Sequence, residues 1–314
     1  MKDIKLKEFA QALRESDKYR VLEKYHKPEY YHIDDHSPKL IGIFLDVETT
    51  GLDYTRDKII ELGIVCFEYS IDGRIFRVLD EFNGYQDPGI PIPQEIIQLT
   101  GISDDMVRDQ NIDINEIEQY IKKANLIISH NVGFDRGFLE TMFPGLPQKP
   151  WACLMNGINW RSEGIESSKL EYIAYKCGFF YEGHRAGIDC LAGIHVLTQK
   201  LPKSQNLVFS ELLANSRKIT FKIWAFGAPY AHKDTLKARG YKWSQTKTDK
   251  TQAWCIELER DQVKDELDYL RSDIYGHRIS LPIEIIDAYT RFSTINTVVD
   301  AEKYKDYLAW IKTI

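Results

Sequence analysis

The chain contains an apolar stretch that carries two acidic residues near its end. Residues 41–45 read Ile-Gly-Ile-Phe-Leu, and Asp46-Val47-Glu48 follow directly. Side chains alternate across a β-strand, so the pattern predicts a buried strand with Asp46 and Glu48 on one face. Two adjacent carboxylates repel each other and lose hydration unless a partner neutralises them. The pattern favours a divalent cation held by carboxylate oxygens; the alternative is a strand that simply ends in solvent.

Two later segments place further acids directly after apolar runs. Residues 126–128 lead into residues 130–135, His-Asn-Val-Gly-Phe-Asp, which predicts a strand, a short loop and a helix start. Residues 184–189, His-Arg-Ala-Gly-Ile-Asp, begin another apolar helix. Four carboxylates and one histidine in this arrangement predict a two-metal hydrolytic site with a general base. The candidate metal ligands are Asp46, Glu48, Asp135 and Asp189, and the candidate base is His184.

The histidine has a functional and an ordinary interpretation. His184 lies in a loop flanked by glycines, just before the helix that carries Asp189. Imidazole suits a base that must take a proton from water near neutral pH. A single histidine can equally be a surface or core residue. The position of His184 beside an acid-bearing helix favours the catalytic interpretation.

The pattern around these motifs predicts an α/β domain. Residues 58–69 and 75–82 alternate loosely between apolar and polar positions. Together with the first strand they predict a three-stranded antiparallel meander joined by short turns. Short helices are expected near residues 93–99, 103–107 and 113–123, where Ser103 and Asp113 are suitable N-caps.

Changes in composition divide the chain into four expected segments. They are an N-terminal helical or extended arm (1–39), the domain with the acids (40–201), a linker (202–217) and a small α+β accessory domain with C-terminal helices (218–314). Two apolar stripes predict that residues 261–314 are helical. The first contains Val263, Leu267 and Leu270, and the second contains Ile283, Ile286 and Tyr289.

The accessory segment is locally basic and aromatic. Residues 218–260 contain nine Lys or Arg against four Asp or Glu, with five Trp or Tyr interleaved. Basic residues mixed with aromatics are typical of surfaces that bind single-stranded nucleic acid. The alternative is that the aromatic residues form the core of this domain and the lysines are merely solvated. The candidate nucleic-acid contacts are Arg239, Lys242, Trp243 and Lys247.

Composition adds limits on partners and location. The net charge is −6, so contacts with phosphates would have to come from local basic patches rather than from the whole molecule. Five scattered cysteines without a Cys-x-x-Cys pair indicate neither a zinc site nor a disulfide framework. No run is apolar and long enough to span a membrane, and the N-terminus does not have the pattern of a signal peptide. A cytoplasmic location is therefore expected.

The three motifs together resemble those of the DEDDh 3′–5′ exonucleases. The resemblance rests on Asp46-x-Glu48, on residues 130–135 and on His184 with Asp189, and it runs from about Leu40 to about Lys200. This family includes the proofreading epsilon subunit of bacterial DNA polymerase III. Members of the wider family carry either His or Tyr in the third motif, and His184 implies that this chain belongs to the histidine branch. One departure is the Trp-Ala-Cys-Leu of residues 151–154, where the family usually has a strand ending in Asp-Thr.

The resemblance implies a fold and a reaction. The fold would be a ribonuclease-H-like mixed five-stranded sheet flanked by helices, followed by the small α+β domain. The reaction would be metal-dependent hydrolysis from the 3′ end of DNA, preferably single-stranded, releasing nucleoside 5′-monophosphates. Two Mg²⁺ or Mn²⁺ ions would be bound by the four acids, with His184 as general base. The residues implied to contact substrate are Thr49, Leu52, His130, Asn131 and Phe134.

Other functions remain open from the sequence. One is an RNA-trimming 3′–5′ exoribonuclease, and another is a non-catalytic protein on the same scaffold that binds nucleic acid or a replication partner. The resemblance suggests DNA repair or proofreading and a polymerase partner. Gln205–Phe209 also faintly resembles the short peptides that bind the bacterial sliding clamp. The alternative for that segment is an amphipathic stretch that packs Leu207, Phe209, Leu212 and Leu213.

Overall fold

A mixed five-stranded sheet organises the first of two compact units, residues 1–215. The computed structural model describes residues 2–16, 18–246, 250–277, 279–295 and 302–314. The sheet order is β4-β3-β2-β5-β6, in which β2, β3 and β4 are antiparallel and β2, β5 and β6 are parallel. This confirms the predicted meander and the ribonuclease-H-like sheet. The strands are β2 (Leu40–Thr49), β3 (Ile59–Tyr69), β4 (Ile75–Tyr85), β5 (Leu126–Ser129) and β6 (Trp151–Cys153).

Strand register brings the predicted motifs to one place. In β2 and β5, Phe44 pairs with Ile128 in parallel, so both strands end in the same direction. The loop that follows β5 therefore lies beside the acidic end of β2. On its other side, β2 pairs with β3, and Glu48 is directly opposite Glu61.

Helix α8 (Ala186–Leu197) lies on the face of β2 that carries the acids. A Cβ atom on Gly193 would come within 2.2 Å of the Phe44 ring, so only glycine permits this contact. Phe44 and the two acids share a face by strand alternation. The close contact at Gly193 therefore directs the first turn of α8 towards Asp46 and Glu48.

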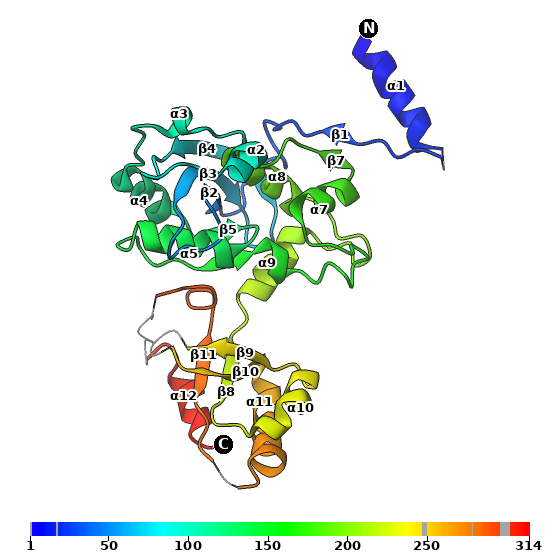
Figure 1. The fold of residues 1–314 in the computed structure, drawn as a ribbon. Helices are drawn as coiled ribbons and strands as arrows, with labels where there is room; N and C mark the ends of the chain where they lie inside the picture. The colour runs from blue at the N-terminus through cyan, green and yellow to red at the C-terminus, as the bar shows by residue number, and fades with distance from the viewer. Residues whose placement is uncertain (1, 17, 247–249, 278, 296–301) are drawn as a thin grey trace. The chain divides into compact units, whose positions relative to one another are not determined.

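Further helices flank the sheet (Figure 1). Helices α4 (Ile114–Lys123) and α5 (Val132–Met142) also contact β2. Side chains of α7 (Leu170–Cys177) share a buried cluster with Phe44. The remaining short elements are α2 (Gln94–Thr100), α3 (Asp104–Val107), α6 (Leu154–Gly157) and β7 (Phe179–Phe180).

The N-terminal segment begins with a helix and continues as an extended chain. Helix α1 spans Lys2–Arg14, and the short strand β1 (Glu23–Lys24) pairs in parallel with β7. The Arg20 guanidinium donates to the carbonyl oxygens of Tyr175 and Lys176 at the end of α7. Further along, the Tyr31 amide donates to the Phe76 carbonyl. Residues 20–31 are thus bonded to the rest of the first unit at both ends.

The segment predicted as a linker does not behave as one. Residues 208–216 form helix α9 (Val208–Ser216), and Phe209 and Leu212 are fully buried with the core of the first unit. The two compact units divide between Asn215 and Ser216. The apolar spacing of this segment is that of an amphipathic helix, which is the alternative that the sequence offered.

The second unit, residues 216–314, contains a four-stranded antiparallel sheet in the order β11-β8-β10-β9. Its strands are β8 (Thr220–Ala225), β9 (Lys242–Gln245), β10 (Gln252–Leu258) and β11 (Ile283–Ile286). Its helices are η1 (Tyr230–His232), α10 (Lys233–Ala238), α11 (Arg260–Tyr269), the π-helical η2 (Leu270–Ile274) and α12 (Lys305–Ile311).

One helix expected in the second unit is a strand. Residues 283–286 pair antiparallel with β8, with Ile283 opposite Ile223. Three apolar residues in four fit either period over so short a run, and the free edge of β8 decides between them. The stripe of Val263, Leu267 and Leu270 is helical and buried, as predicted. In the described part of the chain, no helix has both the length and the apolar composition needed to cross a bilayer.

We predict that Phe209→Ala destabilises the first unit by about 3–5 kcal/mol, because it empties a fully buried site. The Phe209 ring centroid lies 5.9 Å from that of Phe67 and 5.0 Å from that of Tyr69, so both neighbours lose contact. Urea unfolding followed by tryptophan fluorescence measures the change. The matched control is Phe180→Ala, which removes a 43% exposed ring. Equal effects of the two substitutions would contradict the packing described for α9.

Candidate active site

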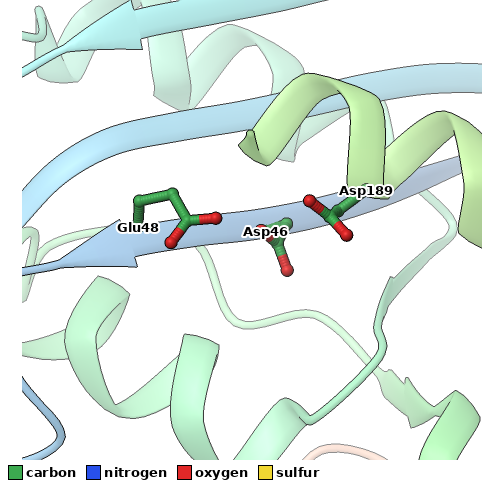
Figure 2. A group of neighbouring side chains, drawn as sticks. All are labelled: Asp46, Glu48 and Asp189. Carbon is green, nitrogen blue, oxygen red and sulfur yellow. The ribbon is translucent and has the colours of Figure 1, made fainter. Parts of the chain in front are cut away.

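Three carboxylates from two elements meet at the end of β2. Asp46 and Glu48 come from β2, and Asp189 comes from the first turns of α8 (Figure 2). One oxygen of each lies within 4.8 Å of the others, which is close enough for a shared cation. Because every donor is a carboxylate oxygen, the group fits hard cations such as Mg²⁺ or Mn²⁺.

Asp189 is oriented by hydrogen bonds of its own. The Tyr181 hydroxyl donates to Oδ1 at 3.1 Å, and the Arg185 backbone amide donates to Oδ2 at 3.0 Å. Both donors come from the segment that leads from β7 into α8. The loop and the helix therefore fix the carboxylate before any cation is bound.

Asp135, the fourth predicted ligand, lies beside this group and outside it. It is only 2% exposed, and its Oδ1 accepts the Val47 amide of β2 at 3.2 Å. Its carboxyl group thus faces the backbone between Asp46 and Glu48. The structure brings three of the predicted ligands within range of one ion and places the fourth against the same strand.

The acids shift one another's protonation. Burial raises the pKa of Glu48 to about 8, and Asp189, Glu61 and Asp135 add to the effect. Burial also raises the pKa of Asp135 to about 8 and that of Asp189 to about 6. The pKa of Asp46 is raised by burial and by the neighbouring carboxylates, first of all Asp135. These groups can all be ionised at neutral pH only beside added positive charge, which a divalent cation supplies.

A fifth acid escaped the sequence analysis. Glu61 of β3 is fully buried and accepts hydrogen bonds from the Arg185 guanidinium, at 2.8 Å from Nη2. Its only sequence signal is a lone acid within the apolar run of residues 59–65, at the position that pairs with Glu48. Tyr181 was missed as well, because a hydroxyl that orients a ligand has no distinctive pattern.

His184 is accessible and has an unusual backbone. Its side chain is 46% exposed, and its φ of 63° lies in the left-handed region that few non-glycine residues adopt. The Nε2 atom is 3.9 Å from Glu171 Oε1. Such backbone conformations cluster at functional sites, so this one favours a functional role for the loop.

The residues expected to contact substrate are in different environments. Leu52 is 86% exposed, so it is available for contact and does not serve the core. Thr49 is buried, and its hydroxyl donates to the Gly51 carbonyl. Asn131 precedes α5 without a side-chain cap, and Phe134 lies 4.9 Å from Phe138 between ring centroids.

His130 combines burial with an unused ring nitrogen. Its Nδ1 is buried without a hydrogen-bond partner among the described residues. Burial lowers the pKa of His130 to about 4, so the ring is neutral at neutral pH. A neutral ring in the loop between β5 and α5 fits a residue that supports the loop or contacts the substrate, and not one that supplies positive charge.

Of the candidate nucleic-acid contacts in the second unit, some are exposed and some are engaged by other side chains. Trp243 is 54% exposed on the edge strand β9, and Lys242 beside it is exposed. Arg239 instead donates to both oxygens of Glu266 and lies 3.8 Å from the Tyr269 ring. Lys247 lies outside the described residues. Tyr241 is buried, which fits the alternative that some of these aromatics form the core.

The clamp-like peptide is partly hidden. Within Gln205–Phe209, Val208 and Phe209 are buried in the core of the first unit. A peptide that docks by its apolar side chains would have to leave that core. The burial therefore favours the packing interpretation of this segment.

Comparison with known proteins gives consistent findings. Residues 43–197 match the family described as Exonuclease (RNase_T). The chain is 38% identical over 165 residues to DNA polymerase III PolC-type of Pediococcus pentosaceus, covering 49% of this chain and 11% of that protein. It is 30% identical over 219 residues to the PolC-type polymerase of Caldanaerobacter subterraneus, covering 63% of this chain and 15% of that protein. The chain thus spans only a small part of these relatives.

Matches among solved structures have lower sequence identity than these relatives. Exonuclease X in complex with 5′ overhanging duplex DNA has 21% identity and a TM-score of 0.38, covering 54% of this chain and 99% of that one. A structure of exonuclease I has 16% identity and a TM-score of 0.48, covering 87% of this chain and 70% of that one.

We predict that the stability of the metal-free protein falls as pH rises from about 4 to 8. The folded carboxylates hold protons that the unfolded chain releases near pH 4, because the pKa of Asp189 is raised to about 6 and those of Glu48 and Asp135 to about 8. Saturating Mg²⁺ or Mn²⁺ should then raise Tm by on the order of 5–10 °C at pH 8 and by less at pH 5.

Differential scanning fluorimetry across this pH range measures both effects. Asp46→Asn should weaken the metal-induced rise. A rise in Tm that is the same at pH 5 and pH 8, or that persists in full in Asp46→Asn, would contradict the assignment of this site.

Proposed function

We propose, because residues 43–197 belong to the DEDDh-like 3′–5′ exonuclease family, that this protein hydrolyses phosphodiester bonds from the 3′ end of DNA. Single-stranded DNA is the preferred substrate, and nucleoside 5′-monophosphates are the products. The observation that carries the proposal is the meeting of Asp46, Glu48 and Asp189 within 4.8 Å. Mutually repelling acids held this close together favour a bound divalent cation, which the proposed reaction requires.

The acids would hold the metal. Asp46, Glu48 and Asp189 would bind Mg²⁺ or Mn²⁺, with Asp135 contributing to a site for two ions. Bound cations would neutralise phosphate charge and lower the pKa of a water molecule. Since Asp189 is already oriented by Tyr181 and Arg185, little rearrangement of this ligand is required. Asp135 would have to release the Val47 amide or bind through its other oxygen.

The remaining residues move a proton and hold the strand end. His184 accepts the proton of the attacking water at its ring, and its exposure leaves it accessible to the substrate. Leu52 contacts the terminal base, which its 86% exposure supports. Thr49, His130, Asn131 and Phe134 complete the contacts to the terminal nucleotide. In the second unit, Lys242 and Trp243 are proposed as contacts with nucleic acid, because both are exposed.

The cellular role is proposed from the relatives. Similarity to polymerases named PolC-type supports proofreading or repair, with a polymerase as a partner. Docking to a sliding clamp through Gln205–Phe209 has less support, because Phe209 is buried. A cytoplasmic location accords with this role.

We predict that the protein shortens 5′-labelled single-stranded DNA from the 3′ end when Mg²⁺ or Mn²⁺ is present. Chelator should abolish the ladder, and Asp46→Ala should reduce the rate by at least about 100-fold, because even residues that only support metal ligands contribute 10–100-fold. Denaturing gels of a time course measure the rate. Asp265→Ala, an exposed acid of α11, is the control and should be unaffected.

Matched RNA substrates decide between the two sugar types. Faster digestion of RNA would replace the DNA proposal with the exoribonuclease function. If neither strand is digested while Mn²⁺ binds normally, the protein is a binding protein on the exonuclease scaffold.

We predict that His184→Ala lowers kcat by about 10²–10⁴-fold, as expected for removal of a general base. Mn²⁺ affinity should remain within about threefold of wild type, because the imidazole is not among the grouped ligands. Single-turnover digestion and Mn²⁺ titration by electron paramagnetic resonance give the two values. Unchanged kcat would rule out the assigned role of His184, and an equal loss of Mn²⁺ binding would make it a ligand instead.

A further inference from the structure

Among the described residues, the fully buried carboxylate of Glu61 accepts more hydrogen bonds than those of Asp46, Glu48 and Asp189, which are called the grouped acids below. Oε1 accepts from Asn83 Nδ2 at 2.8 Å and from Arg185 Nη2 at 2.8 Å. Oε2 accepts from the Ala186 amide at 3.0 Å and from Arg185 Nε at 3.2 Å. Both oxygens are therefore engaged by the protein. Glu61 lies beside the grouped acids, but it is not free to act as a metal ligand.

The partners of Glu61 belong to the start of α8. The first amides of a helix lack partners within the helix and must find them elsewhere. Here the Ala186 amide donates to Glu61, and the Gly187 amide donates to Asn83 Oδ1 at 3.1 Å. Glu61 is on β3 and Asn83 is opposite Gly63 on the neighbouring strand β4. Two adjacent strands thus bind the first turn of α8.

The backbone contact at this position is unusually close. A Cβ atom on Gly63 would lie 2.5 Å from the Ala186 carbonyl carbon, so a larger residue would push the helix away. Glycine at residue 63 lets α8 rest directly on β3. The distance between the helix start and the sheet is therefore determined by backbone contact, and the hydrogen bonds of Glu61 and Asn83 determine its direction.

Arg185 connects Glu61 with the carboxylates of the candidate active site. Its side chain bonds Glu61 and the Tyr85 hydroxyl, the latter at 2.6 Å. Its backbone amide donates to Asp189 at 3.0 Å. Residue 185 also directly follows His184. Residue 185 therefore links the contacts of Glu61 to both Asp189 and His184.

We propose that Glu61 is a positioning residue of the nuclease site. By holding Arg185 and the first turn of α8, it keeps Asp189 and the His184 loop directed at Asp46 and Glu48. A buried ion pair is a poor source of net stability, whereas several hydrogen bonds from a rigid strand specify one geometry. The inference rests on the proposed function for its kinetic consequences, and on the metal site alone for its binding consequences.

Glu61→Gln tests the proposal with a matched control. The amide would place a donor against either the Ala186 amide or the Arg185 guanidinium. We expect Mn²⁺ affinity, titrated by electron paramagnetic resonance, to fall by about 10–100-fold, as for other residues that orient metal ligands. At saturating Mn²⁺, kcat should fall by at least about tenfold, with KM for single-stranded DNA within about threefold.

The control is Glu68→Gln. Glu68 is on the same strand and accepts a hydrogen bond from Arg77 of β4 at 2.9 Å, so it also forms a Glu–Arg pair, but away from α8. It should keep the Mn²⁺ affinity, kcat and KM of wild type. Glu61→Asp, which retains the charge, should recover part of the lost Mn²⁺ affinity.

Arg185→Lys provides a second test of the same link. Its side chain is 37% exposed, so it can be changed without burying a new group, and lysine cannot form the paired bonds of arginine. We expect about a tenfold loss of Mn²⁺ affinity in a folded protein. If Glu61→Gln does not fold, this variant decides. A folded Glu61→Gln or Arg185→Lys protein that binds Mn²⁺ like wild type overturns the proposal.

The outcomes separate this inference from the function it deepens. Wild-type protein that binds Mn²⁺ but digests no strand refutes the proposed nuclease, while loss of Mn²⁺ binding in Glu61→Gln still supports positioning. Wild-type digestion that Glu61→Gln retains in full refutes positioning alone.

Discussion

The organising constraint of the first unit is repulsion among carboxylates held at the end of one strand. Asp46, Glu48 and Asp189 lie together in surroundings where burial raises their pKa values, with Asp135 and Glu61 close by. Such a group costs free energy in the absence of a cation. The protein keeps it because strand pairing and the contact between Phe44 and Gly193 leave these side chains no other place. Under the proposed function, the stability given up at this point would become affinity for a divalent metal.

The five acids differ in how many hydrogen-bond partners the protein gives them, and this difference indicates different roles. Glu61 is balanced by the Arg185 guanidinium and bonded to a helix start. Asp135 is satisfied by one backbone amide, and Asp189 by a hydroxyl and an amide. Asp46 and Glu48 have the least support from the protein itself. Glu61, which has the most partners, is the acid proposed to position the helix start, and Asp46 and Glu48, which have the fewest, are those that a cation would serve best.

The parts of the first unit outside the motifs support the same region. The extended N-terminal chain pairs β1 with β7, directly before the loop that carries Tyr181 and His184. Arg20 occupies carbonyl groups at the end of α7, the helix that carries Glu171 next to His184. Helix α9 closes the core beneath Phe67 and Tyr69. The side chain of the candidate base is thus exposed, while the elements around its loop are held by strand pairing, hydrogen bonds and core packing.

The sequence by itself determined the strands of the meander and the facing of Asp46 and Glu48, because strand and helix periods are local properties of the chain. It also determined that Asp189 opens a helix after a loop with His184. Only the tertiary structure decided which side chains meet: Glu61 with Arg185, and Asp135 with the Val47 amide. The same holds for residues 283–286, which became a strand on the edge of β8, and for Phe209, which a linker would have exposed. Partners distant along the chain leave no local period, so they are set by packing and strand pairing rather than by any pattern in the sequence.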